Sequence, residues 1–89
     1  MWLVNIKNSM DLGSKYITKK AVEYFNRGNF KFKLQEYEFS VKDYDKAIEL
    51  SPDFAEAYCK RGDAKSLSGK HNEAIKDYNE AINIILNKY

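Results

Sequence analysis

The strongest constraint in this sequence is that its second part repeats itself at a fixed spacing. Residues 21–54 align with residues 55–88 without a gap, and ten of the 34 aligned positions are identical. Similarity at a constant period of 20–50 residues indicates an array in which neighbouring repeats stack to bury a shared core. The identical pairs are Ala21/Ala55, Tyr24/Tyr58, Arg27/Arg61, Gly28/Gly62, Lys31/Lys65, Lys42/Lys76, Asp43/Asp77, Tyr44/Tyr78, Ala47/Ala81 and Ile48/Ile82.

Each repeat contains two segments with the periodicity of a helix. In the first repeat, apolar and small residues recur at steps of three and four up to about residue 34, with Ser14 or Thr18 able to cap the helix start. Gln35 and Glu36 form the predicted joint, and a second helical stripe ends near Leu50. The sequence therefore predicts a helical hairpin.

The second hairpin is separated from the first by Ser51, Pro52 and Asp53. Proline ends a helix and is favourable as the first residue of the next, so we expect Ser51 to cap a helix that starts at Pro52. That helix should end near Leu67. A turn at residues 68–69 should precede the fourth helix, which begins near residue 71 and runs to the end of the chain.

Glycine occurs inside the first helix of each repeat, at Gly28 and Gly62. A glycine within a helix costs roughly 0.5–1 kcal/mol relative to alanine. Two glycines at equivalent positions therefore indicate that a neighbouring ring or backbone needs the space. The candidates are the recurring tyrosines, which are Tyr24/Tyr58 and Tyr44/Tyr78.

This pattern of residues resembles the tetratricopeptide repeat, a helix-turn-helix unit of 34 residues. The first repeat matches at Tyr24, Gly28, Ser40, Tyr44, Ala47 and Pro52, and the second at Tyr58, Gly62, Ala74, Tyr78 and Ala81, with Leu86 in place of the proline. Pentatricopeptide repeats, which bind RNA, have a similar length, but the glycine, alanine and proline positions favour the tetratrico type. The resemblance implies an all-α fold, an α-α superhelix of two antiparallel helix-turn-helix hairpins within residues 14–89.

Residues 1–13 lie outside the repeat, and their periodicity fits either a helix or a strand. We expect a short N-terminal arm, with a leftover half-repeat or a vector-derived leader as alternatives.

The resemblance further implies a non-enzymatic protein-protein interaction module, an adaptor or scaffold that binds a peptide or helix. The first helix of each repeat would line the binding groove. The residues that helical geometry places there are Val22, Phe25, Asn26, Asn29, Phe32 and Lys33 in the first repeat and Glu56, Cys59, Lys60, Asp63, Ser66 and Leu67 in the second.

The first repeat also resembles the opening repeat of co-chaperone adaptors, which hold the terminal carboxylate of a chaperone tail with lysines and asparagines. Asn29 matches that clamp, but Phe25 stands where a lysine is expected and Lys60 where an asparagine is expected. Charge-assisted hydrogen bonds to carboxylate are the reason for those residue types. We therefore expect no chaperone-tail binding, and at most a partial anion site at Asn29 and Lys60.

The sequence contains no recognisable machinery for catalysis, metal binding or a cofactor. One histidine, His71, and one cysteine, Cys59, cannot complete a metal site between them, and no phosphate-binding glycine loop is present. We expect Asp43, Asp45 and Asp77 on exposed helix faces and Cys59 partly buried. The 15 basic and 13 acidic residues are interleaved, which argues against a nucleic-acid surface. The predicted partner is thus a protein or peptide, with no small-molecule substrate.

The expected location is the cytoplasm. A single cysteine cannot form an internal disulfide, which fits a reducing compartment. The apolar run at residues 2–4 is too short for a signal peptide, and no stretch approaches the roughly 20 apolar residues of a membrane span.

The last predicted helix carries more apolar residues than its own hairpin needs. We expect this helix to pack against a second copy of the chain or against the N-terminal arm, since terminal repeats need a polar outer face. Dispersed apolar exposure without a partner is the alternative. The residues expected to support self-association are Tyr78, Ile82, Ile84, Ile85, Leu86 and Tyr89.

Overall fold

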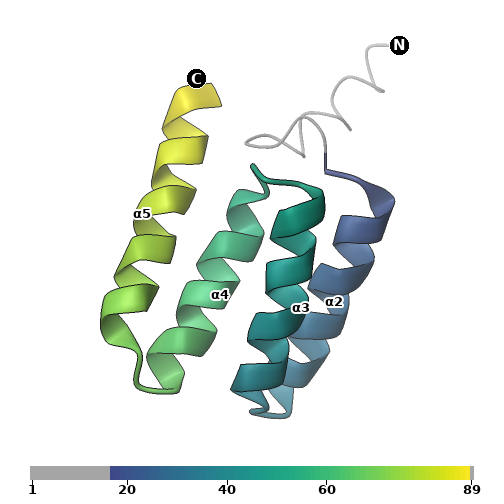
Figure 1. Ribbon diagram of the computed structural model, residues 1–89, viewed down its shortest axis with the longest axis vertical. Helices are drawn as coiled ribbons and strands as arrows, with labels where there is room; N and C mark the ends of the chain where they lie inside the picture. Colours follow the sequence, from purple (N-terminus) through teal and green to yellow (C-terminus); the bar gives the residue numbers. More distant parts are fainter. Residues whose placement is uncertain (1–16, 89) are drawn as a thin grey trace.

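The computed structural model describes residues 17–88, and this part of the chain forms four helices without a strand. The helices are α2 (Lys19–Lys33), α3 (Tyr37–Leu50), α4 (Ala55–Leu67) and α5 (His71–Lys88). Figure 1 shows them as two antiparallel hairpins, α2 with α3 and α4 with α5. The predicted all-α repeat fold is therefore confirmed. The predicted N-terminal arm, the alternative cap at Ser14 and the terminal Tyr89 lie outside the described residues.

The helix boundaries within each hairpin follow the sequence signals. Thr18 caps α2, because its Oγ1 accepts a hydrogen bond of 3.1 Å from the backbone amide of Ala21. The joint between α2 and α3 turns at Gln35, which has a positive φ of 64°. The second hairpin turns at Gly69, with φ of 91°, a conformation in which glycine has no steric cost.

The connection between the hairpins differs from the prediction. α4 begins at Ala55 rather than Pro52, and Ser51 ends α3 instead of capping α4. The buried Ser51 hydroxyl accepts a 3.1 Å hydrogen bond from the Thr18 amide, which ties the start of α2 to this connection. Phe54 then turns its ring into the core before the helix starts, so the chain needs a turn where a cap was expected.

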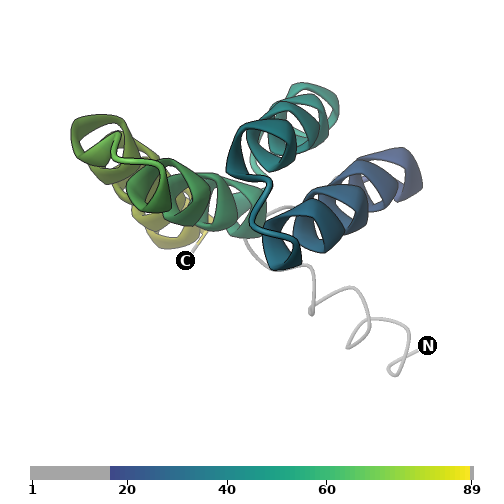
Figure 2. The ribbon, with the colours of Figure 1, turned by 90° about the horizontal axis from the view of Figure 1, so that it is seen from below.

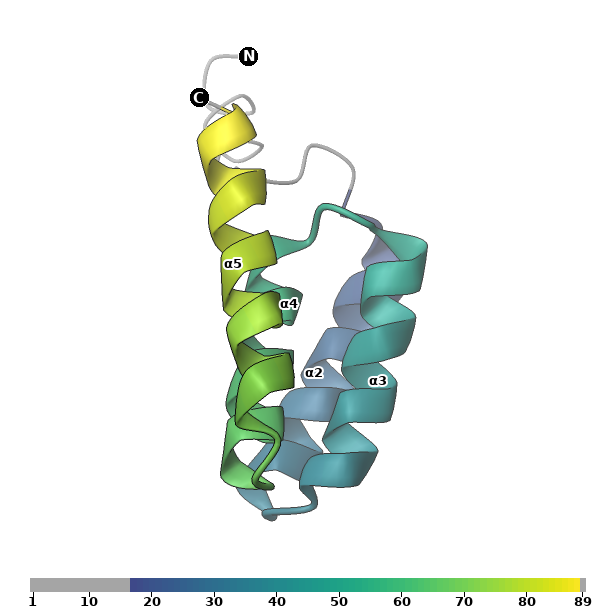
Figure 3. The same cartoon turned by 60° about the vertical axis from the view of Figure 1, so that its left-hand side comes forward.

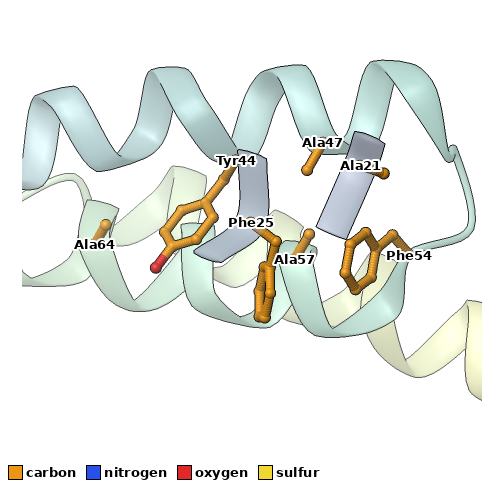
Figure 4. Close-up of a cluster of buried hydrophobic side chains, with 7 residues drawn as sticks. All are labelled: Ala21, Phe25, Tyr44, Ala47, Phe54, Ala57 and Ala64. Carbon is orange, nitrogen blue, oxygen red and sulfur yellow. The ribbon is translucent and has the colours of Figure 1, made fainter. Parts of the chain in front are cut away.

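The main core fills the space between the hairpins (Figure 4). The ring of Phe25 packs against Tyr44 and Phe54, with ring centroids 5.7 and 4.9 Å away. Small residues close the remaining gaps and let the helix backbones approach. These fully buried residues are Ala21, Ala47, Ala57 and Ala64.

The repeated glycines make room for tyrosine rings of the following helix. A Cβ atom on Gly28 would lie 2.6 Å from Cε1 of Tyr44, and one on Gly62 would lie 2.8 Å from Cε1 of Tyr78. This confirms the second tyrosine of each repeat as the residue that fills the space. The first tyrosine has another role, illustrated by Tyr58, whose ring lies 5.2 Å from the Arg61 guanidinium.

The two hairpins lie side by side, and their first helices are neighbours. Across the boundary between the hairpins, α4 packs mainly against α3 and also touches α2. Figure 2 shows the α4/α5 pair to one side of the α2/α3 pair, and Figure 3 shows α5 on the outside of this arrangement. The face between α2 and α4 is therefore formed by the first helix of each repeat.

Candidate binding groove

A cleft of about 460 Å³ lies where α2 and α4 adjoin. Five of its six lining residues belong to the predicted groove, four on α2 and one on α4. The sixth, Phe30, was not predicted. The complete lining is Asn26, Asn29, Phe30, Phe32, Lys33 and Lys60.

The side chain of Asn29 is held in place from below by the core. The hydroxyl of Tyr44 donates a 2.6 Å hydrogen bond to Oδ1 of Asn29. Burial of the ring, together with the charges of Asp63 and Asp43, raises the pKa of Tyr44 above its ordinary value, so the hydroxyl stays protonated and remains the donor. The amide NH₂ of Asn29 is therefore the part of the side chain that can donate to a ligand.

Lys60 extends into the cleft from α4. Its Nζ lies 4.1 Å from the centroid of the Phe32 ring, which is the geometry of a cation–π contact. The Phe32 ring in turn meets Tyr37 edge-on at 5.3 Å. With Lys33 on the same lining, the cleft combines two cations, two amides and aromatic surface, which suits a peptide with a carboxylate.

The other predicted groove residues lie outside this cleft. Val22, Glu56 and Leu67 are exposed, whereas Cys59 and Ser66 are half-buried. Asp63 is also half-buried, and its Oδ1 accepts a 2.5 Å hydrogen bond from the Tyr78 hydroxyl. Cys59 is partly buried as predicted, and this burial raises the pKa of its thiol.

Phe25 does not line the groove surface. Only 9% of the residue is exposed, because its ring fills the core between Tyr44 and Phe54. Phe25 therefore has a structural role in the core, and the prediction that it lines the groove is wrong.

In each repeat a cluster of charged residues links the second helix to the first. Asp43 is buried and lies 2.9 Å from Nζ of Lys31. Asp77 is also buried, and Arg61 donates hydrogen bonds to it from Nε and Nη2 at 3.0 and 2.7 Å. The expectation that both acids lie on exposed faces is therefore wrong. The sequence could have indicated this burial, because the aspartate recurs in both repeats together with a lysine (Lys31/Lys65) and an arginine (Arg27/Arg61).

The α5 residues that were predicted to support self-association differ in their exposure. Ile82, Ile85 and Leu86 are exposed, and Tyr78 is half-buried. Ile84 is 8% exposed and packs in a second core cluster with Ala55 and Ala81, so it is not available to a partner. Ile75 is exposed but was missed.

Phe30 was not predicted as a groove residue, because it lies beside the groove stripe of α2 and not on it. The residue is 63% exposed and also lines a shallow hollow on the outer side of α2 with Glu23, Asn26, Arg27 and Lys31. The sequence could have drawn attention to Phe30, because the equivalent residue of the second repeat is the much smaller Ala64.

The comparison with protein families fits this architecture. A family described as TPR repeat matches residues 28–69, and a family described as tetratricopeptide repeat matches residues 55–88. The chain belongs to the tetratricopeptide repeat family. Such repeats form a protein-protein interaction fold, generally without enzymatic activity, and this tetratricopeptide repeat chain is accordingly a protein-interaction module.

A curated relative supports the same family. The chain is 36% identical over 56 residues to the small glutamine-rich tetratricopeptide repeat-containing protein 2 of Saccharomyces cerevisiae. The match covers 63% of this chain but only 16% of the relative, so the similarity concerns a small part of the yeast protein.

The described residues contain neither a metal-binding cluster nor a membrane-spanning helix. No group of three or more His, Cys, Asp or Glu side chains within residues 17–88 is placed to hold a metal ion. None of the helices in that range has both the length and the apolar character to cross a bilayer.

Proposed function

We propose that this chain is an adaptor module whose cleft between α2 and α4 binds an extended peptide carrying an acidic side chain. The observation that supports the proposal is the convergence of Asn29, Lys33 and Lys60 on one cleft from two repeats. Lysines bind the carboxylate, and asparagine amides can exchange hydrogen bonds with the peptide backbone. The hydrogen bond from Tyr44 fixes Asn29 before the peptide arrives, which lowers the entropic cost of binding.

The test begins with a random peptide library displayed to the full chain. We expect the enriched peptides to contain Asp or Glu, and one such peptide, synthesised with a fluorophore, serves as the probe for polarisation titrations. The double variant Lys33→Glu/Lys60→Glu should weaken its binding by about tenfold or more, since each tenfold loss corresponds to about 1.4 kcal/mol.

The matched control is Lys46→Glu/Lys76→Glu, which makes the same change in net charge at exposed positions on α3 and α5, away from the cleft. Its affinity should stay within about twofold of the unchanged chain, given the screening of exposed charges at physiological salt. Equal losses in both variants, or undiminished binding by the cleft variant, would refute the proposal.

Self-assembly through α5 is the second candidate function. The exposed Ile82, Ile85 and Leu86 favour it, because burying one large aliphatic side chain stabilises by roughly 1.5–3 kcal/mol. Sedimentation equilibrium at micromolar concentration tests it. A dimer that dissociates in the Ile82→Glu and Ile85→Glu variants supports self-assembly, and a strict monomer unaffected by them removes it.

A further inference from the structure

The structure shows how the second helix of a repeat receives a neighbouring helix. On α3, Val41, Asp45 and Ile48 lie four and three residues apart, on one stripe of the helix. Asp45 accepts a 2.8 Å hydrogen bond from Nη1 of Arg61, which places this stripe against α4. Val41 and Ile48 are half-buried and pack against the core that contains Ala57 and Ala64 of α4.

The same stripe recurs on α5, where the described residues provide no helix to cover it. Its equivalent residues, 34 positions later, are Ile75, Asn79 and Ile82. Ile75 is 55% exposed and Ile82 is 52% exposed, and Asn79 is exposed between them. Among the described helices α5 packs only on α4, and its other side faces outward (Figure 1). Thus α5 presents a surface patterned like the one that binds α4.

The side of α4 that meets α3 defines what such a surface accepts. Ala57 and Ala64 are seven residues apart and fully buried. Their small side chains let the two helices approach closely. The partner of Asp45 is the cation Arg61, but on α5 the equivalent residue is the neutral Asn79. A helix on α5 would therefore carry an uncharged hydrogen-bonding residue at the position of the arginine.

The first helix of a second copy does not meet these requirements. The residues of α2 equivalent to Ala57 and Ala64 are Glu23 and Phe30. A glutamate there would bury a charge against isoleucine, and a phenylalanine would hold the helices apart. Stacking of copies head to tail, with α2 on α5, is thus opposed by both residues.

We propose that the stripe of Ile75, Asn79 and Ile82, here called the α5 stripe, binds a helix of a partner protein. The contact face of that helix carries small side chains seven residues apart, with an uncharged polar residue between them. This surface lies on a different helix from the peptide-binding cleft, so the inference does not depend on the proposed function.

The experiment supplies a helix of this kind from the chain itself. A flexible Gly/Ser linker joins the end of the full chain to a second copy of residues 53–68, in which Cys59→Ser prevents oxidation and Arg61→Gln matches Asn79. The linker keeps the copy at an effective concentration in the millimolar range, which compensates for the low helicity of a short isolated segment. The matched control copy additionally carries Ala57→Glu and Ala64→Phe, the residues of α2.

We expect the fusion with the alanine copy to unfold about 5 °C or more above the fusion with the control copy. Isotope-labelled methyl groups of Ile75 and Ile82 should shift in the NMR spectrum of the first fusion only. Ile82→Glu in α5, at an exposed position where folding is retained, should abolish both effects.

Three results would overturn the proposal. One is equal unfolding temperatures for the two fusions. The second is a stabilisation that persists with Ile82→Glu, which would show that the copy replaces α4 in its own hairpin. The third is a dimer of the unfused chain that Ile82→Glu dissociates, which would assign the α5 stripe to a second copy. Peptide binding by the cleft is measured separately, so none of these results bears on the proposed adaptor function, whereas the third would support self-assembly through α5.

Discussion

Replacing Gly28 by alanine places two known effects in opposition. In an exposed helix the change would stabilise the protein by about 1 kcal/mol, because alanine is the better helix former. Here the new Cβ would lie 2.6 Å from the ring of Tyr44, whereas carbon atoms pack best at about 3.5–4.0 Å. The ring cannot move aside easily, since it is fully buried and its hydroxyl is bonded to Asn29.

Overpacking of this kind typically costs about 1–3 kcal/mol. We therefore expect Gly28→Ala to lose up to about 2 kcal/mol of unfolding free energy, because the gain of about 1 kcal/mol in helix propensity offsets part of the overpacking cost. For a domain of this size the thermal midpoint should fall by up to about 15 °C. Urea denaturation followed by circular dichroism measures the change, provided that the slope with urea stays constant.

The matched variant is Gly62→Ala, whose Cβ would lie 2.8 Å from the half-buried ring of Tyr78. That ring has solvent on one side and can retreat, so the loss should be smaller. Combining Gly28→Ala with Tyr44→Leu should remove most of the additional cost, because the obstructing ring atoms are gone. A higher urea midpoint for Gly28→Ala alone would refute the reasoning, since helix propensity would then outweigh the ring contact.

Three further outcomes follow from the polar contacts. Asp77→Asn should lower the unfolding free energy by about 1–3 kcal/mol in urea titrations, because it leaves Arg61 partly buried without its main anion. Asp45→Asn, at an exposed position, should cost less than about 1 kcal/mol. A hydrogen bond to the Asp63 carboxylate raises the pKa of Tyr78 to about 12, above its unfolded value of about 10. The unfolding free energy should therefore stay constant below about pH 10 and fall as the pH rises toward about 12. Tyr78→Phe should reduce that fall. Thr18→Ala should lower the thermal midpoint through the loss of about 0.5–2 kcal/mol of capping energy, and Thr18→Ser should retain most of it.

The fold could be predicted from the sequence because both repeats carry the same pattern of helix-forming, small and aromatic residues. Helical period, the recurring glycine and the tyrosine that fills its space agree in both units, and the structure contains the four expected helices. The joint at Gln35 and the turn at Gly69 also lie where the sequence places them. Local and global preferences coincide in this part of the chain, which is the condition under which sequence reasoning succeeds.

The failures occur where tertiary contacts override a local signal. Ser51 and Pro52 have the chemistry of a helix start, but the Ser51 hydroxyl accepts the amide of Thr18, 33 residues earlier in the sequence. Ile84 lies on a helix with apolar residues on several sides, and periodicity alone could not tell which of them meets α4. Asp43 has the residue type of a solvated surface, but Lys31 makes its burial tolerable.

The comparison between the two repeats explains why the fold is readable while the ligand is not. The identical pairs with an assigned contact act in packing, as Gly28 and Tyr44 do, or in the ion clusters, as Asp43 does. The six pairs of predicted groove positions differ in every case: Val22/Glu56, Phe25/Cys59, Asn26/Lys60, Asn29/Asp63, Phe32/Ser66 and Lys33/Leu67. Even the shared hydrogen bond from the second tyrosine meets an amide at Asn29 and a carboxylate in the other repeat. Because the scaffold contacts stay the same while the side chains at the predicted groove positions change, these positions can alter their chemistry without altering the helices that carry them. A ligand of the proposed groove must therefore be sought through the residues that the repeats do not share.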